Sequence, residues 1–506
     1  MAHDGSEGVS PEGWLPDRVS VGALTRTFPP ELVDRVVEVT DTREVRRRLL
    51  PARLVVYFVL ALWLFRGRNC GYGRVMSKLV DGLYHRRRGR QLLDGVLDPA
   101  GWVDGGQGRR WRPPNISSLA RARSRLGADP LHMLFDAVAG PVGGSADSPA
   151  ADAVAGVFCC GLRVVSMDGS TSDVPDTAEN SEHFSRPSNG TRAGAFPQVR
   201  WLAAAESGTG ALIGASFGPY TVGEQTLARD LLGALEPGML VLADRNFLCH
   251  TLARDVLATG AHILWRASAS FTLAPIEVLA DGTYLAVLHP AHTADGPPIT
   301  VRVIEYTVHT SPADNDNGDG SGDGDGEDSS EVFCLVTDLL DVEAYPALDL
   351  AGAYPMRWEA ETVIGHHKTD MGEGMPVLRS RDPQGVAQEM WALFAVYQAI
   401  HTLIGAAVDA TGIPPEKISF PQALTAATDT VTAGFPPQDL DLAVATFLLK
   451  ILDPRSFVRE RPNRASPRAT KKAGDFPARK DQPSVVRVTR RLQIHCLQHD
   501  SVLLKA

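Results

Sequence analysis

Residues 157–268 alternate between strand-like and helix-like patterns, and this order limits the possible folds more than any other feature of the chain. The strand-like runs are short and rich in apolar or β-branched residues, and the segments between them repeat apolar residues at helical spacing. In order, they are a strand Leu162–Ser170, a hairpin Gln198–Pro219, a helix Gly223–Leu235, a strand Gly238–Phe247, a helix His250–Thr259 and a strand Ala261–Ser268. This order predicts a mixed α/β core.

Two of the predicted strands end in an aspartate, Asp168 in "VVSMDG" and Asp244 in "LVLADR". Ligands collect at the carboxyl ends of strands in open α/β sheets, so both aspartates are candidate ligand-binding residues. Considered singly, each also has a structural explanation. Asp-Gly is a common turn, and Asp244 is followed by Arg245, with which it could form an ion pair.

A third candidate carboxylate lies in "YPMRWEAETVIGHHK", residues 354–368, which we predict to be one helix. Offsets of three, four and seven place four chemically distinct side chains on one face, namely Tyr354, Arg357, Glu361 and Lys368. This set suits a phosphodiester, with a metal ion on the acid and phosphate oxygens on the bases. Glu359 is predicted to face away from Glu361, and His366 and His367 to be surface or DNA-facing residues.

The three carboxylates suit magnesium. Mg²⁺ prefers carboxylate and water oxygens, and carboxylates can hold a pair of such ions about 3.5–4 Å apart. No cluster of cysteine and histidine competes for a softer metal. We therefore predict that Asp168, Asp244 and Glu361 hold two Mg²⁺ ions, for which Mn²⁺ could substitute.

These residues resemble the DDE transposases of the insertion element 4 family. The family signature is Y-x2-R-x3-E-x6-K, and residues 354–368 fill every position of it. The segments "DGSTSDVPDTAEN", "FPQVRW" and "GMLVLADRNF" around the two aspartates also resemble the family. The resemblance covers roughly residues 52–468.

The resemblance implies an RNase H-like catalytic core with an antiparallel β insertion, and DNA cleavage and strand transfer at the ends of an insertion sequence. It implies that Asp168, Asp244 and Glu361 are catalytic and metal-binding, and that Tyr354, Arg357 and Lys368 bind DNA phosphates. It also implies a homodimer on DNA, because two ends are joined. Trp265 and Phe333 are candidates for stacking a flipped base, although both also fit core positions in strands.

The expected fold class is α/β, with a helical N-terminal domain and a helical, basic C-terminal region added to the catalytic core. The expected boundaries are a flexible leader at 1–29, a helical DNA-end-binding domain at 30–142, a catalytic domain at 157–375 with a β insertion at about 269–340 that contains an acidic disordered loop at 312–331, and a helical region at 376–506 with a basic arm at 455–491.

The net charge of −10 hides a segregated charge distribution. Residues 312–331 hold eight acids and no base, and removing those acids would leave a net charge of −2. Basic residues gather at 43–53, 85–90, 109–114 and 455–491. This segregation favours double-stranded DNA as the partner. No apolar run is long enough to span a bilayer, and no signal peptide opens the chain, so we expect a cytoplasmic, nucleoid-associated bacterial protein without a membrane partner.

The predicted helix at residues 115–127 carries Arg121, Arg123 and Arg125 and could lie against DNA. Ser117 or Ser118 is its predicted N-cap, and Gly127 its predicted end. Two other functions remain open from the residues alone. One is an RNase H-like nuclease without strand transfer, and the other is a transposase-derived DNA-binding regulator without catalysis.

Overall fold

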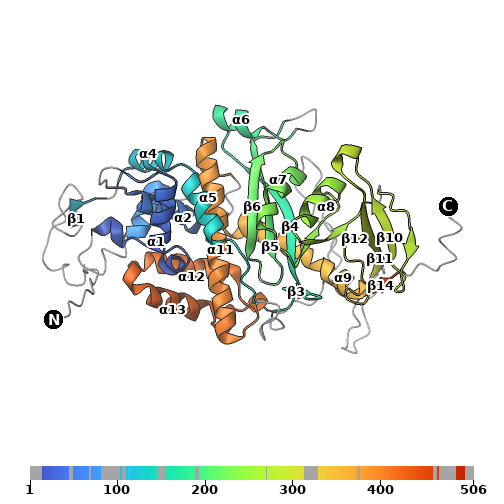
Figure 1. Ribbon diagram of the computed structural model, residues 1–506. Coiled ribbons are helices and arrows are strands. Elements are labelled where there is room, and N and C mark those ends of the chain that lie inside the picture. The colour runs from blue at the N-terminus through green and yellow to red at the C-terminus, as the bar shows by residue number, and fades with distance from the viewer. Residues whose placement is uncertain are drawn as a thin grey trace, which may run out of the picture. The chain divides into compact units, whose positions relative to one another are not determined.

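The computed structural model describes residues 14–44, 49–67, 70–80, 103–104, 110–112, 114–144, 154–188, 193–268, 271–312, 329–372, 377–459, 464–465 and 486–495. The chain forms two compact units. Unit 1 comprises Met1–Val157, Val165–Ala234 and Trp358–Val458, and unit 2 comprises Phe158–Val164, Leu235–Arg357 and Arg459–Ala506. Figure 1 shows the elements of both.

The N-terminal part of unit 1 is helical. Its elements are η1 (Leu15–Arg18), η2 (Gly22–Arg26), α1 (Pro30–Val39), α2 (Ala52–Leu64), α4 (Ile116–Leu126) and α5 (Asp129–Val138), with the two-residue strands β1 (Val103–Asp104) and β2 (Arg110–Trp111). Helix α2 is apolar on every face and buried along its length, as expected of a helix inside a core.

The flexible leader predicted for residues 1–29 is wrong from Trp14 onward. Trp14, Leu24 and Phe28 are buried, and two short 3₁₀ helices form between them. The backbone N–H of Ala23 donates to Thr430 Oγ1 at 3.0 Å, which ties this segment to a helix near the end of the unit. The segment is polar and contains proline, so its sequence alone does not indicate an ordered structure. Its few apolar residues are buried against partners that are distant in the sequence. Residues 1–13 lie outside the described residues.

Helix α11 (Pro383–Thr411) is the central helix of unit 1, and it packs against α5 and α2. Its length and composition would allow it to cross a membrane, but 78% of its most apolar window is buried inside the protein, as in the core helix of a globular unit. Helices α12 (Phe420–Thr432) and α13 (Leu440–Ile451) follow it.

Three antiparallel strands complete unit 1. They are β4 (Leu162–Asp173), β5 (Gln198–Glu206) and β6 (Leu212–Pro219), and the short helices α6 (Ala178–Phe184) and α7 (Glu224–Asp230) accompany them. Strand β5 lies between the other two, with Asp168 paired to Ala203 and Ala203 paired to Ala215. The predicted hairpin is therefore present, and β4 brings Asp168 to its side.

Unit 2 is built on a long sheet. Strands β7 (Met239–Ala243) and β8 (His262–Arg266) run parallel and are connected by α8 (His250–Leu257). Strands β9 (Glu277–Val278), β10 (Tyr284–Leu288), β11 (Ile299–Pro312) and β12 (Ser329–Thr337) pair antiparallel, and β12 joins β8. Strand β7 also neighbours β4, whose first residues belong to this unit. The predicted mixed α/β class is confirmed.

The C-terminal segment differs from the helical region that the sequence predicts. Val486–Ile494 forms strand β14, which pairs antiparallel with β11, and the two-residue strand β13 (Arg464–Ala465) pairs with β14. Apolar and polar or basic residues alternate in this segment, as in a β-strand. The high arginine content made the segment resemble a charged arm in the sequence. The rest of the predicted basic arm, like the basic segment at 85–90 and residues 313–328 of the predicted acidic loop, lies outside the described residues.

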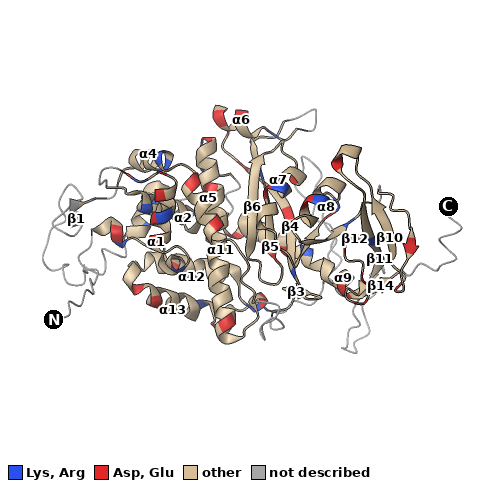
Figure 2. Cartoon of the chain, viewed as in Figure 1, with Lys and Arg blue, Asp and Glu red and all other residues tan. Residues whose placement is uncertain are grey.

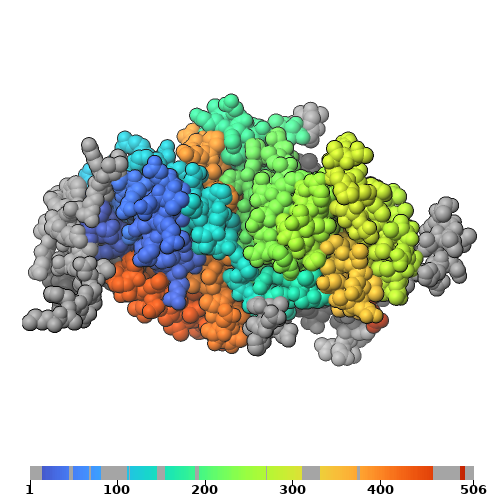
Figure 3. All heavy atoms as spheres, viewed as in Figure 1, coloured from blue at the N-terminus to red at the C-terminus, as the bar shows by residue number. Residues whose placement is uncertain are grey.

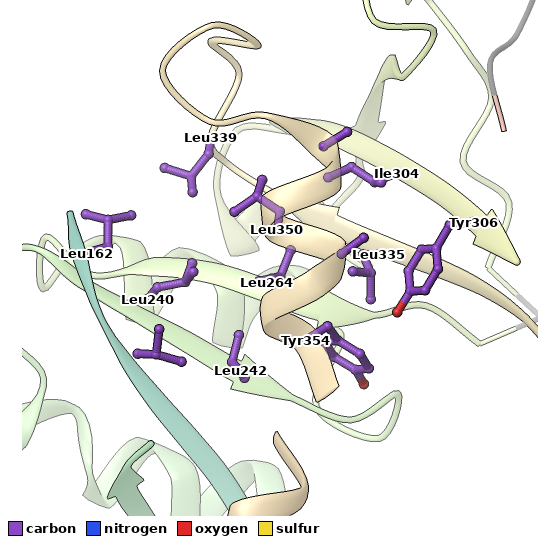
Figure 4. Close-up of a cluster of buried hydrophobic side chains, with 13 residues drawn as sticks. Leu162, Leu240, Leu242, Leu264, Ile304, Tyr306, Leu335, Leu339, Leu350 and Tyr354 are labelled. Carbon is purple, nitrogen blue, oxygen red and sulfur yellow. The ribbon is translucent and has the colours of Figure 1, made fainter. Parts of the chain in front are cut away.

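The core of unit 2 lies between the sheet and helix α9 (Ala347–Ala353). Figure 4 shows Leu350 above the side chains of Leu240, Leu242 and Leu264 on the strands. Tyr354 closes this cluster at the end of the helix, where only 4% of the residue is exposed. Burying this apolar surface fixes the helix that leads into the signature segment.

Candidate active site

Asp168 lies inside β4 and is half-buried. Its predicted position at the end of a strand is wrong, because β4 continues to Asp173 and pairs with β5 along that whole stretch. Its Oδ1 accepts a hydrogen bond from the backbone N–H of Gly169 at 2.8 Å, which orients the carboxylate. A side chain at Gly169 would begin only 3.2 Å from Glu224 Oε1 and 3.2 Å from the carbonyl oxygen of Trp201. Glycine therefore permits Glu224, the first residue of α7, to lie beside the aspartate's strand. No sequence pattern singled out Glu224.

Asp244 follows β7 directly and is half-buried, as predicted for a residue at a strand end. Its two carboxylate oxygens accept hydrogen bonds from Asn246, from the backbone N–H at 2.8 Å and from Nδ2 at 3.2 Å. The side chain thus organises the turn after the strand through Asn246, which is a different contact from the ion pair with Arg245 considered from the sequence. The same hydrogen bonds also set the orientation of the Asp244 carboxylate.

The signature segment is helical but is not the single α-helix predicted. It comprises η6 (Tyr354–Arg357), a 3₁₀ turn, then α10 (Trp358–Gly365), and then η7 (His366–Asp370), a π-helical turn. A 3₁₀ turn has fewer and a π turn more residues than an α turn, so equal offsets no longer mark one face. In the sequence, the boundary between the two units falls between Arg357 and Trp358. Tyr354 and Arg357 therefore belong to unit 2, and Glu361 and Lys368 belong to unit 1.

The Tyr354 hydroxyl donates to the carbonyl oxygen of Ala243 at 3.3 Å, immediately before Asp244. Burial raises the pKa of Tyr354 to about 12; Arg357 and Arg266 oppose that shift, and Asp244 adds to it. Tyr354, Arg357 and Asp244 are therefore electrostatic neighbours within unit 2. The hydroxyl stays protonated at neutral pH and acts as a hydrogen-bond donor.

Glu361 is exposed on α10, whereas Glu359 faces the interior of unit 1. Glu359 Oε2 accepts a hydrogen bond from the backbone N–H of Gly208 at 2.6 Å, and burial raises the pKa of this carboxyl. This agrees with the preference for Glu361, since the two glutamates point in different directions.

Lys368 lines a cavity of about 270 Å³ in unit 1. Its other walls include Arg66 from the end of the α2 segment, Thr171 and Asp173 from the end of β4, and His367. Burial lowers the pKa of Lys368, and the Asp173 carboxylate opposes that shift. Two cations and one acid thus face this space. Arg66 is far from the signature in sequence, and no motif predicted its presence here.

The two histidines before Lys368 are packed inside unit 1, so their predicted surface or DNA-facing position is wrong. His367 is 3% exposed, and its ring lies 4.4 Å from that of Tyr397. His366 stacks on Phe420 at 4.3 Å. The π-helical turn and the aromatic residues of α11 and α12 provide this apolar setting, which the local sequence does not reveal.

Two family models of known proteins match this chain. The family model described as "Insertion element 4 transposase N-terminal" matches residues 18–136, and the model described as "Transposase DDE domain" matches residues 160–399. The chain belongs to the insertion element 4 family of DDE transposases. It is thus a transposase, a DNA endonuclease and strand transferase that acts on DNA and depends on divalent metal ions.

Two relatives come from Escherichia coli (strain K12). The transposase InsG for insertion sequence element IS4 is 24% identical over 402 residues, covering 77% of this chain and 78% of the relative. The putative transposase InsZ is 27% identical over 242 residues, covering 47% of this chain and 68% of the relative. A solved piggyBac transposase synaptic complex with hairpin DNA aligns with a TM-score of 0.39 and 9% identity over 85% of this chain and 81% of that chain.

The acids of a DDE transposase must bind divalent cations, and the donor chemistry here fits Mg²⁺. Asp168, Asp244 and Glu361 offer only carboxylate oxygens, and none of the three is fully buried. Asp168 and Glu361 belong to unit 1, and Asp244 belongs to unit 2. Over the described ranges, no three His, Cys, Asp or Glu side chains form a group that could hold a metal ion.

The aromatic residues considered for base stacking occupy core positions in this transposase. Trp265 is fully buried on β8. Phe333 on β12 lies between the stacked ring of Tyr306, at 5.1 Å, and the guanidinium of Arg266, at 4.2 Å. Both residues stabilise the sheet of unit 2, which is the structural alternative considered from the sequence.

Proposed function

We propose that this transposase cleaves double-stranded DNA at the terminal inverted repeats of its insertion sequence and transfers the ends to target DNA. Asp168, Asp244 and Glu361 are the proposed catalytic residues, in an RNase H-like core. The main observation that supports this proposal is the position of Asp244 directly after β7. Both of its carboxylate oxygens accept hydrogen bonds from Asn246, which orient the side chain there. The enzyme is proposed to act as a homodimer on the DNA, in the bacterial cytoplasm at the nucleoid.

The same three carboxylates would hold the metal ions, for which we propose two Mg²⁺, replaceable by Mn²⁺. When bound, such ions activate an attacking hydroxyl and stabilise a leaving oxygen in phosphoryl transfer. The contribution of the chain is to orient the carboxylates. The Gly169 N–H does so for Asp168 and Asn246 for Asp244.

Tyr354, Arg357 and Lys368 are the proposed phosphate-binding residues. Arg357 can form two parallel hydrogen bonds to a phosphate, and Lys368 adds a second cation from the wall of the 270 Å³ cavity. The Tyr354 hydroxyl donates to Ala243, so a phosphate would have to take over this donor. Its high pKa keeps the proton in place for either acceptor.

The proposal is tested with the purified full chain and labelled duplexes taken from the DNA that flanks the gene. Asp168→Asn, Asp244→Asn and Glu361→Gln should each lower Mg²⁺-dependent cleavage by at least 100-fold, on the order seen when a catalytic group is lost. DNA binding in a mobility-shift assay should stay unchanged. Asp230→Asn on the exposed end of α7 is the matched control and should cleave normally.

Wild-type cleavage by any one of the three variants would remove that acid from the assignment. Transfer of the cleaved end into a second duplex separates the remaining functions. Cleavage without transfer would identify a nuclease, and binding without cleavage would identify a regulator.

A further inference from the structure

Helix α4 is rich in basic residues. It carries Arg121, Arg123 and Arg125 and no acid, whereas α1 and α5 both contain acids. Figure 2 shows these basic positions in blue along α4, and Figure 3 shows side chains of this part of the chain at the molecular surface. The three arginines are not equivalent, because their burial differs.

Arg123 anchors the helix to the body of unit 1. It is only 4% exposed. Its guanidinium donates from Nε to Gln388 Oε1 at 3.1 Å and from Nη2 to Ser380 Oγ at 3.1 Å. Gln388 Nε2 in turn donates to the carbonyl oxygen of Arg123 at 2.7 Å. This network fixes the rotation of α4 about its axis, so its exposed residues are presented in a defined way.

The presented face has two exposed rows. Ile116, Ala120 and Ser124 form one row, and Ser117, Arg121 and Arg125 form the next, one position further around the helix. Ile116 is 64% exposed although it is apolar. The Asn115 side chain caps this end of the helix by accepting from the Ser118 N–H at 2.8 Å, so the predicted serine caps are wrong, and Gly127 ends the helix as predicted.

A groove with a volume of about 450 Å³ runs beside the first row. Its far wall is the segment from Arg379 to Gln384, in which Arg381 is exposed. Asp382 is the acid of this wall, and it is engaged in capping α11 by accepting from the Gly385 N–H at 2.9 Å. Exposed arginines therefore flank the face of α4, with Arg381 across the groove and Arg121 and Arg125 on the second row.

We propose that α4 enters the major groove of duplex DNA and is the recognition helix for the ends of the insertion sequence. The major groove is about 12 Å wide and admits one α-helix. Arg121 and Arg381 would contact phosphates on the two sides of the groove. The first row carries short side chains and one aliphatic side chain, so the helix can approach the bases closely, and Ile116 can contact a thymine methyl group. The proposal rests on the transposase function proposed above, which makes terminal DNA the occupant, and the arginines match its charge.

The test measures binding of the full chain by fluorescence anisotropy at several KCl concentrations. The probes are duplexes from the two gene flanks and a random-sequence duplex of equal length. Arg121→Ala and Arg381→Ala should each weaken binding to all probes about 3- to 30-fold and reduce the slope of log affinity against log salt by about one. Ala120→Glu should weaken binding at least 10-fold, because it places a negative charge between two phosphate strands.

The matched control is Ala445→Glu, which adds the same charge at an exposed alanine of α13 and should leave binding unchanged. Unchanged affinity and salt slope in both arginine variants would overturn the proposal, and these surface changes remain informative even if Ala120→Glu fails to fold. Cleavage-deficient variants of the three acids should still bind like the wild type. The α4 assignment and the catalytic assignment therefore fail in different assays.

Discussion

At the scale of single residues, position in the fold decides what each signature side chain can do. Tyr354 is buried and hydrogen-bonded to the backbone beside Asp244, whereas Glu361 is exposed. Glu359, only two residues away, is held inside by the Gly208 N–H. Residues of one short motif thus differ in burial and in hydrogen-bond partners.

Tyr354→Phe removes the hydroxyl that donates to Ala243 and also contacts Arg357, and it keeps the ring that packs into the core of unit 2. The free energy of unfolding should fall by about 1 kcal/mol. If Tyr354 contacts phosphate as proposed, binding to gene-flank duplexes should weaken by roughly 5-fold, in line with one lost hydrogen bond to a charged group. Denaturant unfolding and anisotropy measure the two effects. Unchanged DNA binding combined with slower cleavage would show that the hydroxyl positions Asp244 instead.

At the scale of elements, a buried histidine and aromatic cluster connects η7, α11 and α12. His401 of α11 binds the carbonyl oxygen of Thr209 through Nδ1 at 2.7 Å and stacks near Phe420. Burial lowers the pKa of His366 to about 4 and that of His401 to about 3. The cluster therefore holds neutral imidazoles beside the turn that carries Lys368.

This cluster should make unit 1 sensitive to acid. Between about pH 4 and the unperturbed histidine pKa of about 6.5, the unfolded state binds more protons than the folded state. The free energy of unfolding is therefore not reduced by these histidines above this pH window. It falls as the pH decreases through the window, by up to about 1.4 kcal/mol per pH unit for each histidine. Urea unfolding at pH 7, 6 and 5 measures the slope.

His366→Gln should reduce that slope by the contribution of one histidine, and the exposed His183→Gln, on α6, is the matched control. An identical slope in the wild type and in His366→Gln would show that His366 is already protonated in the folded protein at pH 5.

At the scale of the whole molecule, the net charge influences how strongly the enzyme attracts DNA. Residues 313–328 hold seven of the acids and no base. The flanking strands pair directly, with Thr310 opposite Ser329. The hairpin can thus be closed by a short turn without disturbing the sheet.

Replacing residues 313–328 with a short Gly-Asn turn should leave the melting temperature within a few degrees, since loop length has a small effect on stability. The net charge would change from −10 to −3. DNA affinity should therefore rise at low salt and approach the wild-type value at high salt, where charges are screened. The control keeps residues 313–328 at their full length and replaces the acids with Asn and Gln. Failure of the shortened chain to fold would show that the segment is structural.

The sequence by itself determined the α/β class, the position of Asp244 directly after a strand, the signature motif and the family. These depend on local periodicity and residue identity, which are written in short segments. It did not determine the 3₁₀ and π turns inside the signature, the burial of His366 and His367, the packing of residues after Trp14, or strand β14. The packing of these segments involves partners that are distant in the sequence, such as Thr430 for Ala23 and Phe420 for His366. Only tertiary structure decides which arginine of α4 is buried and which are exposed, because Gln388 and Ser380 select Arg123.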